Sequence, residues 1–122
     1  MKKIKVLLSS RPKLLSEVIR YLIGLQPDME VVGEVLDPLQ LLTVSRKAVV
    51  DVVIITPLKA NGEPKICHQL LAEHPLLIIV TQSANAEAAY VYKSGVDKQR
   101  LEEPSGQSIL IAIRAALPPV VS

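Results

Sequence analysis

Apolar positions along this chain follow two alternating periodicities. Five short segments are apolar at every second position or at every position, and in the stretches between them apolar residues recur every three to four positions. The first pattern is typical of buried strands and the second of amphipathic helices. Strands that alternate with helices predict an α/β fold, in which a doubly wound parallel sheet carries helices on both faces. The predicted strands are Ile4–Leu8, Glu30–Val35, Asp51–Ile55, Leu77–Thr81 and Val96–Leu101.

Prolines, glycines and capping residues set the limits of the predicted helices. Proline is tolerated in the first turn of a helix, and glycine is favoured just after the last turn. The predicted helices are Lys13–Leu25, one that opens at Asp37-Pro38, one that opens at Glu63-Pro64, Asn85–Lys93 before Gly95, and one from Ser105 to Pro118-Pro119. We expect one domain over residues 1–117, with residues 118–122 as a tail or the start of a linker.

Composition and charge exclude several classes of protein. The chain has no apolar run that approaches the ~20 residues of a membrane span. Its basic amino end leads into only a short alternating strand, whereas a secretory signal has a longer apolar region and a cleavage site with small residues. We therefore expect a cytoplasmic protein without a membrane partner. The single cysteine, Cys67, excludes an internal disulfide. The net charge of +2 is small and the cations are dispersed, so we expect no direct contact with nucleic acid.

Several segments carry a family resemblance through their order and spacing. They are Ile4–Leu8, Pro27–Glu34, Asp51–Ile55, Ala72–Pro75, Ile79–Thr81 and Lys93–Asp97. With these segments the chain resembles the receiver domain of two-component response regulators, from Ile4 to Leu117, and most closely those regulators that carry a helix-turn-helix output domain. The resemblance implies a flavodoxin-like (βα)5 fold with five parallel strands in the order 2-1-3-4-5.

The resemblance also assigns positions to a phosphorylation site. In receivers a histidine kinase passes a phosphoryl group to an aspartate at the end of strand three, beside an acidic pair that helps to hold Mg²⁺. Here the acidic pair falls on Ser10 and Arg11, the acceptor on Thr56, and the lysine after strand five on Glu102. Thr81 alone matches the family residue. The aromatic residue that couples phosphorylation to the output face falls on Gln99.

The lost carboxylates change the expected chemistry. None of the four aspartates is predicted at the crevice that the carboxyl ends of the strands form: Asp28 precedes a strand, Asp37 caps a helix, and Asp51 and Asp97 begin strands. A threonine hydroxyl is a poor nucleophile without a neighbouring base. We therefore expect no metal, no cofactor and no enzymatic activity.

Two interpretations of the former site stay open at this point. Arg11 is a cation where the family has an acid, and Glu102 is an acid where the family has a lysine. The two side chains either face each other as an ion pair or both point into solvent. A weaker possibility is a bound anion, held by Ser9, Ser10 and Arg11 before the first helix and by Lys59 in the loop after the third strand.

The last helix offers a possible interface. It is apolar nearly all round, more than one sheet face can cover, so we expect a protein partner or a homodimer through the fourth helix, the fifth strand and the last helix. The alternative is that one stripe docks on the sheet and the rest is ordinary surface. The residues predicted at the interface are Tyr90, Tyr92, Leu110, Ile111 and Arg114.

The expected function is that of an atypical receiver domain. It would act in signal transduction or transcriptional regulation by phosphorylation-independent protein–protein interaction. The alternatives are a receiver that is phosphorylated at an unorthodox residue and a sensor of a small anionic ligand.

Overall fold

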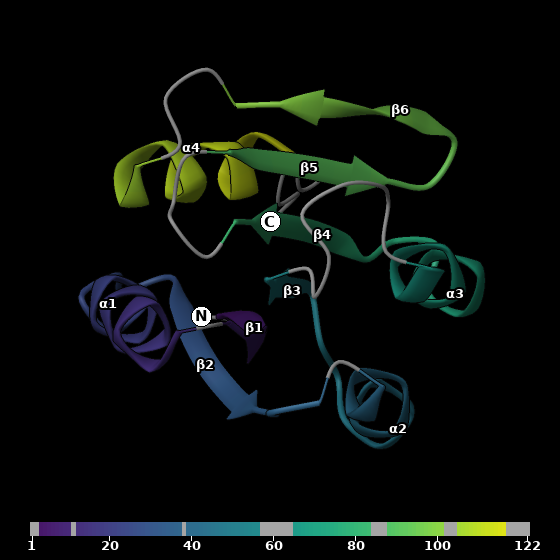
Figure 1. Ribbon diagram of the computed structural model, residues 1–122, viewed down its shortest axis with the longest axis horizontal. Helices are drawn as coiled ribbons and strands as arrows, with labels where there is room; N and C mark the ends of the chain where they lie inside the picture. The colour runs from purple at the N-terminus through teal and green to yellow at the C-terminus, as the bar shows by residue number, and fades with distance from the viewer. Residues whose placement is uncertain are drawn as a thin grey trace.

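A six-stranded sheet forms the centre of the computed structural model, and helices lie on both of its faces (Figure 1). The structure describes residues 3–10, 12–37, 39–56, 65–83, 88–101 and 105–116. In spatial order the strands are β2 (Met29–Glu34), β1 (Ile4–Ser9), β3 (Val52–Ile55), β4 (Ile78–Gln82), β5 (Ala89–Lys93) and β6 (Val96–Arg100). The helices are α1 (Lys13–Gly24), α2 (Gln40–Lys47), α3 (Lys65–Glu73) and α4 (Gly106–Ala116). The predicted α/β class is confirmed.

The first four strands are parallel neighbours. β1 pairs with β2 on one side and with β3 on the other, and β3 pairs with β4. All four residues of β3 are buried, as expected for a strand that is covered on both faces. The order of the strands therefore reverses beside β1, with β2 to one side and β3 and β4 to the other.

The predicted helix Asn85–Lys93 is wrong where the structure describes it, because Ala89–Lys93 is strand β5, antiparallel to β4. Side chains of this segment alternate between the faces of the sheet: Val91 packs with the cluster under α1 and α4, whereas Tyr92 packs with the cluster under α2 and α3. Alternate burial of β-branched and aromatic side chains favours a strand. Residues 84–87 lie outside the described ranges.

The segment predicted as the fifth parallel strand is a strand, but its direction is antiparallel to its neighbour. Val96–Arg100 forms β6, which runs antiparallel to β5 at the edge of the sheet. Ser94 and Gly95 make the turn between the two strands, and Gly95 has a positive φ of 76°, which favours glycine. The sheet is therefore mixed and six-stranded in place of the expected five parallel strands.

Two apolar clusters hold the layers together, one on each face of the sheet. α1 and α4 cover one face, and α2 and α3 cover the other (Figure 1). Along β1, Val6 and Leu8 belong to the first cluster and Leu7 to the second, so the period of two sends the central side chains of this strand into both cores.

Two helix starts can be compared with the predicted caps. Asp37 accepts a hydrogen bond from the N–H of Leu39 at 3.0 Å, but Leu39 and not Asp37 occupies the N-cap position of α2, and no side chain caps that helix. Ser105 caps α4, where its Oγ accepts from the N–H of Ser108 at 3.2 Å. The predicted proline pairs Glu63-Pro64 and Pro118-Pro119 lie outside the described residues. Within the described part of the chain, no helix has the length and apolar character that a membrane span requires.

Candidate functional site at the carboxyl edge of the sheet

The carboxyl ends of β1, β3 and β4 meet at one edge of the sheet. In the parallel register Ser9 lies beside Ile55, and Ile55 lies beside Thr81. The N–H of Thr56 donates to the carbonyl oxygen of Ser9 at 2.9 Å, which joins the two strand ends directly. The order of the strands reverses between β1 and β3, and open α/β sheets commonly bind ligands at such a point.

The side chains that the structure describes at this edge are neutral and buried. The exposed fractions are 1% for Ser9, 9% for Ser10 and 3% each for Thr56 and Thr81, and Gln82 at the end of β4 is 4% exposed. These residues supply hydroxyl and amide groups where a magnesium-dependent site would need carboxylates. No set of three or more His, Cys, Asp or Glu side chains within the described ranges is placed to hold a metal ion.

Among the described residues, three polar atoms at this edge have no hydrogen-bond partner: Ser9 Oγ, Ser10 Oγ and Gln82 Oε1. A buried polar atom without a partner destabilises the folded state by ~1–3 kcal/mol. Such atoms therefore mark a place where a bound polar molecule would find ready hydrogen-bonding groups.

The amino end of α1 lies at the same edge, because the helix begins three residues after Ser10. Pro12 occupies its N-cap position, so no side chain caps the first turn, and that turn contains no acidic residue. The partial positive charge of a helix amino end is therefore not neutralised by a carboxylate of the helix itself.

The predicted site residues are only partly covered by the structure. Ser10, Thr56 and Thr81 come together at the carboxyl edge. Arg11, Glu102 and Lys59 lie outside the described residues, and with them the proposed ion pair between Arg11 and Glu102.

Gln82 was missed by the sequence analysis. It directly follows the matched Thr81, but only the fold shows that its amide is buried.

Two of the aspartates, Asp51 and Asp28, have structural roles away from this edge. Asp51 precedes β3 at the opposite end of the strand, where its Oδ2 accepts from the N–H of Lys5 at 2.9 Å. Asp28 precedes β2 and is bound by Arg114 of α4 through two hydrogen bonds of 2.9 and 2.8 Å. The hydrogen bonds from Arg114 lower the pKa of Asp28, and desolvation opposes this effect.

The five predicted interface residues do not form one surface. Tyr90 and Tyr92 lie on β5 and not on a helix, and they face the α2 and α3 side of the sheet, opposite α4. Leu110 is 2% exposed and belongs to the core under α4, whereas its neighbour Ile111 is 64% exposed. Arg114 is engaged with Asp28 and with the side-chain oxygen of Gln26 at 2.7 Å.

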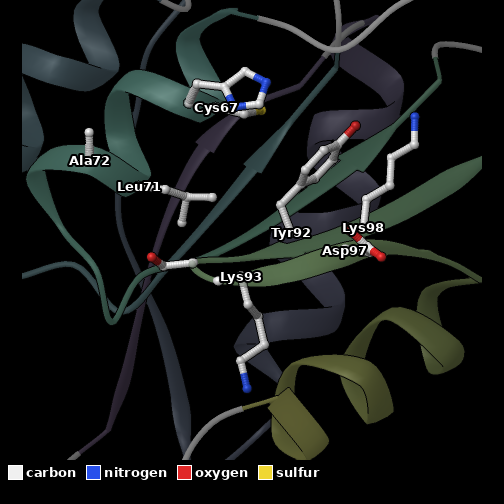
Figure 2. A pocket seen from close by; sticks show the side chains of 10 residues that line it. Cys67, Leu71, Ala72, Tyr92, Lys93, Asp97 and Lys98 are labelled. Atoms are coloured by element: carbon white, nitrogen blue, oxygen red, sulfur yellow. The ribbon is translucent and has the colours of Figure 1, made fainter.

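A cleft lies between α3 and the β5–β6 hairpin, with a volume of about 520 Å³. Figure 2 shows Tyr92 of β5 and Lys98 of β6 extending side by side from the sheet, on the side where Cys67 of α3 lies. Lys98 Nζ also lies 5.0 Å from the centroid of the Tyr90 ring, a cation–π contact. The cleft therefore has an apolar and aromatic floor, and its rim carries two lysines and the carboxylate of Asp97.

A second cleft, of about 510 Å³, lies between the hairpin and α4. Gln99, the predicted switch position, lines it from β6, and Ile111 lines it from α4. Both residues are exposed.

The hairpin thus has a cleft on each face, and neither cleft includes the buried hydroxyl groups of the carboxyl edge. Comparison with known proteins does not assign either feature: no protein-family model matches this chain, and no curated protein is similar to it.

Proposed function

We propose that this chain is a degenerate receiver-like domain that acts in signal transduction or transcriptional regulation by binding a protein partner without phosphoryl transfer. The order of its parallel strands, β2-β1-β3-β4, agrees with the first four strands of the flavodoxin-like order 2-1-3-4-5. The β5–β6 hairpin replaces the remaining helix and parallel strand of that fold. The domain would therefore combine four receiver-like parallel strands, β2, β1, β3 and β4, with an antiparallel hairpin at one edge of the sheet.

The buried neutral side chain of Thr56 is the observation that carries this proposal. It occupies the end of β3, where a phosphoacceptor carboxylate would lie, and it is 3% exposed. Its hydroxyl would need a base to become a nucleophile. His68 is exposed on α3, and His74 follows the far end of that helix, next to the start of β4. Neither histidine is at the carboxyl edge.

A direct test compares partner binding with and without a phosphodonor. A partner captured by crosslinking in a native extract would be purified, and its Kd for this protein measured before and after incubation with acetyl phosphate and Mg²⁺. We expect the same Kd and an unchanged intact mass of the protein, with a phosphorylatable receiver domain as positive control. A phosphoryl adduct accompanied by a change in Kd would contradict the proposal.

A homodimer through the exposed face of α4 remains part of this proposal. Ile111 is the large apolar residue that this face presents to solvent. If a second copy covers it, Ile111→Glu should reduce the sedimentation coefficient to that of a monomer. If the wild-type protein sediments as a monomer at all concentrations, the homodimer is ruled out, and the partner would be a different protein.

The orphaned polar atoms at the carboxyl edge favour a second candidate function, the sensing of a small polar or anionic ligand. Ser9 Oγ and Ser10 Oγ are donors close to the uncapped amino end of α1. Inorganic phosphate and nucleotides are suitable probes. A rise in Tm that disappears in the Ser9→Ala and Ser10→Ala variants would support this function, and an unchanged Tm at millimolar probe would count against it.

A further inference from the structure

Within the described part of the chain, the edge strand β6 has a neighbouring strand on one side only. It closes the sheet order next to β5, and Figure 1 shows it as the outermost strand. The side chains of residues 97–100 are all exposed. An edge of this kind presents backbone donors and acceptors that can pair with another extended chain.

The ladder between β5 and β6 determines which backbone groups face outwards. The N–H of Leu101 donates to the carbonyl oxygen of Ala89 at 2.9 Å, and Gln99 lies opposite Val91 in the same register. Hydrogen-bonded pairs alternate in an antiparallel ladder, so the backbone groups of Gln99 face β5. Those of Arg100, which lies opposite Tyr90, therefore face the open edge.

The charges on this edge are complementary to an acidic strand. Arg100 lies opposite Tyr90, and Lys98 reaches over the ring of the same tyrosine, so both cations are on the α3 side of β6. They are two residues apart, which is the repeat of side chains along one face of a strand. An added strand with carboxylates at alternate positions would place an acid beside each of them.

A second copy of this chain fits the same edge poorly. Two copies related by a two-fold axis keep the same faces of their sheets aligned, so residues directly opposite each other lie on the same face. In a register centred on Lys98, the Lys98 residues of the two copies lie opposite each other. In a register centred on Gln99, Lys98 of each copy lies opposite Arg100 of the other. Registers centred on Asp97 or Arg100 again oppose identical charges. Like charges directly opposite each other are destabilising.

We propose that β6 binds an extended acidic segment of a protein partner, which adds to the sheet as a further strand with its carboxylates facing Lys98 and Arg100. Main-chain hydrogen bonds to Arg100 give affinity, and the two cations select the sequence. This inference rests on the proposed protein-binding function and names the surface and the chemistry of the partner.

The test uses fluorescence anisotropy with the whole chain and a labelled peptide in which glutamate alternates with valine. Two control peptides have lysine in place of glutamate, or the same composition with the glutamates in one block. We expect the alternating acidic peptide to bind most tightly. Equal binding of the alternating and block peptides would overturn the inference, since it would indicate charge attraction without strand pairing.

Two substitutions at one position separate charge from backbone pairing. Arg100→Gln and Arg100→Pro both remove the charge, but only the proline also removes the outward N–H. We expect Arg100→Gln to weaken binding by about twofold to fivefold. Arg100→Pro should weaken it by about a further fivefold, the loss expected for one main-chain hydrogen bond. Equal effects of the two variants would rule out strand addition. Lys47→Gln, which removes an exposed charge on α2, should leave binding unchanged.

Charge reversal provides an independent measurement. If Arg100→Pro loses its fold by circular dichroism, Lys98→Glu combined with Arg100→Glu should lose the acidic peptide and gain the lysine peptide. A doubly reversed variant that still prefers the acidic peptide would overturn the inference. Self-association of the wild-type chain that Arg100→Pro abolishes would identify a second copy as the occupant and would also overturn it. If none of the peptides binds, and a captured partner protein binds the Arg100→Pro variant as tightly as the wild type, then β6 is not the binding surface. That result would overturn this inference but not the proposed protein-binding function.

Discussion

Leu110 and Ile111 are neighbours on α4 with opposite environments, and truncating each to alanine tests how α4 sits on the sheet. Leu110 is 2% exposed and packs in the cluster that contains Val80 and Ile113, whereas Ile111 is 64% exposed. A buried Leu→Ala substitution costs ~2–5 kcal/mol, because it removes apolar burial and leaves a cavity. An exposed Ile→Ala substitution in a helix stays within ~0.5 kcal/mol.

Urea denaturation measures both effects. With a slope of about 1.5 kcal/mol per molar urea, a loss of ~3 kcal/mol lowers the midpoint by about 2 M. We expect Leu110→Ala to show such a shift and Ile111→Ala to unfold within about 0.3 M of the wild type. Equal losses for the two variants would mean that α4 is rotated relative to the arrangement described above. A loss below ~1 kcal/mol for Leu110→Ala would refute its place in the core.

Two further predictions concern the ion pair of Asp28 and the turn of the hairpin. The pKa of Asp28 is lowered in the folded state by Arg114, so the pair stabilises the protein above the unfolded pKa of aspartate, and this contribution is lost as the pH falls through the folded pKa. Asp28→Asn should therefore lower the free energy of unfolding by ~0–1 kcal/mol at neutral pH, because the ion pair is partly exposed. In strong acid the substitution should have no effect. Denaturation curves of both proteins at several pH values measure this difference. Gly95→Ala should lower stability by ~1 kcal/mol because Gly95 has a positive φ of 76°, and a variant with unchanged Tm would contradict this backbone argument.

The sequence predicted the parallel part of the fold because its signals are local. Continuous β-branched runs such as Val52–Ile55 define buried strands, and Pro27 closely follows the end of α1. The hairpin was missed for a physical reason. Ala89–Tyr92 is apolar at every position over a short run, which does not distinguish a strand from a helix, and the Ser94-Gly95 turn also suits a helix end.

The candidate site was predicted only in outline. The resemblance to receiver domains assigned Ser10, Thr56 and Thr81 to one site, and the parallel strands bring them to one edge. The orphaned Gln82 amide depends on which groups surround it after folding, and no local pattern encodes that environment. The separation of Leu110 from Ile111 was likewise hidden, because a helix that is apolar nearly all round does not reveal which face is buried.

The claim that phosphoryl transfer plays no part in this protein is tested most directly by nuclear magnetic resonance. Beryllofluoride mimics a phosphoryl group on an aspartate when Mg²⁺ is present, so both would be titrated into the labelled protein while the amide signals of Ser10, Thr56 and Thr81 are followed. The account predicts no saturable shift of these signals. Saturable shifts centred on Thr56 and dependent on Mg²⁺ would contradict it.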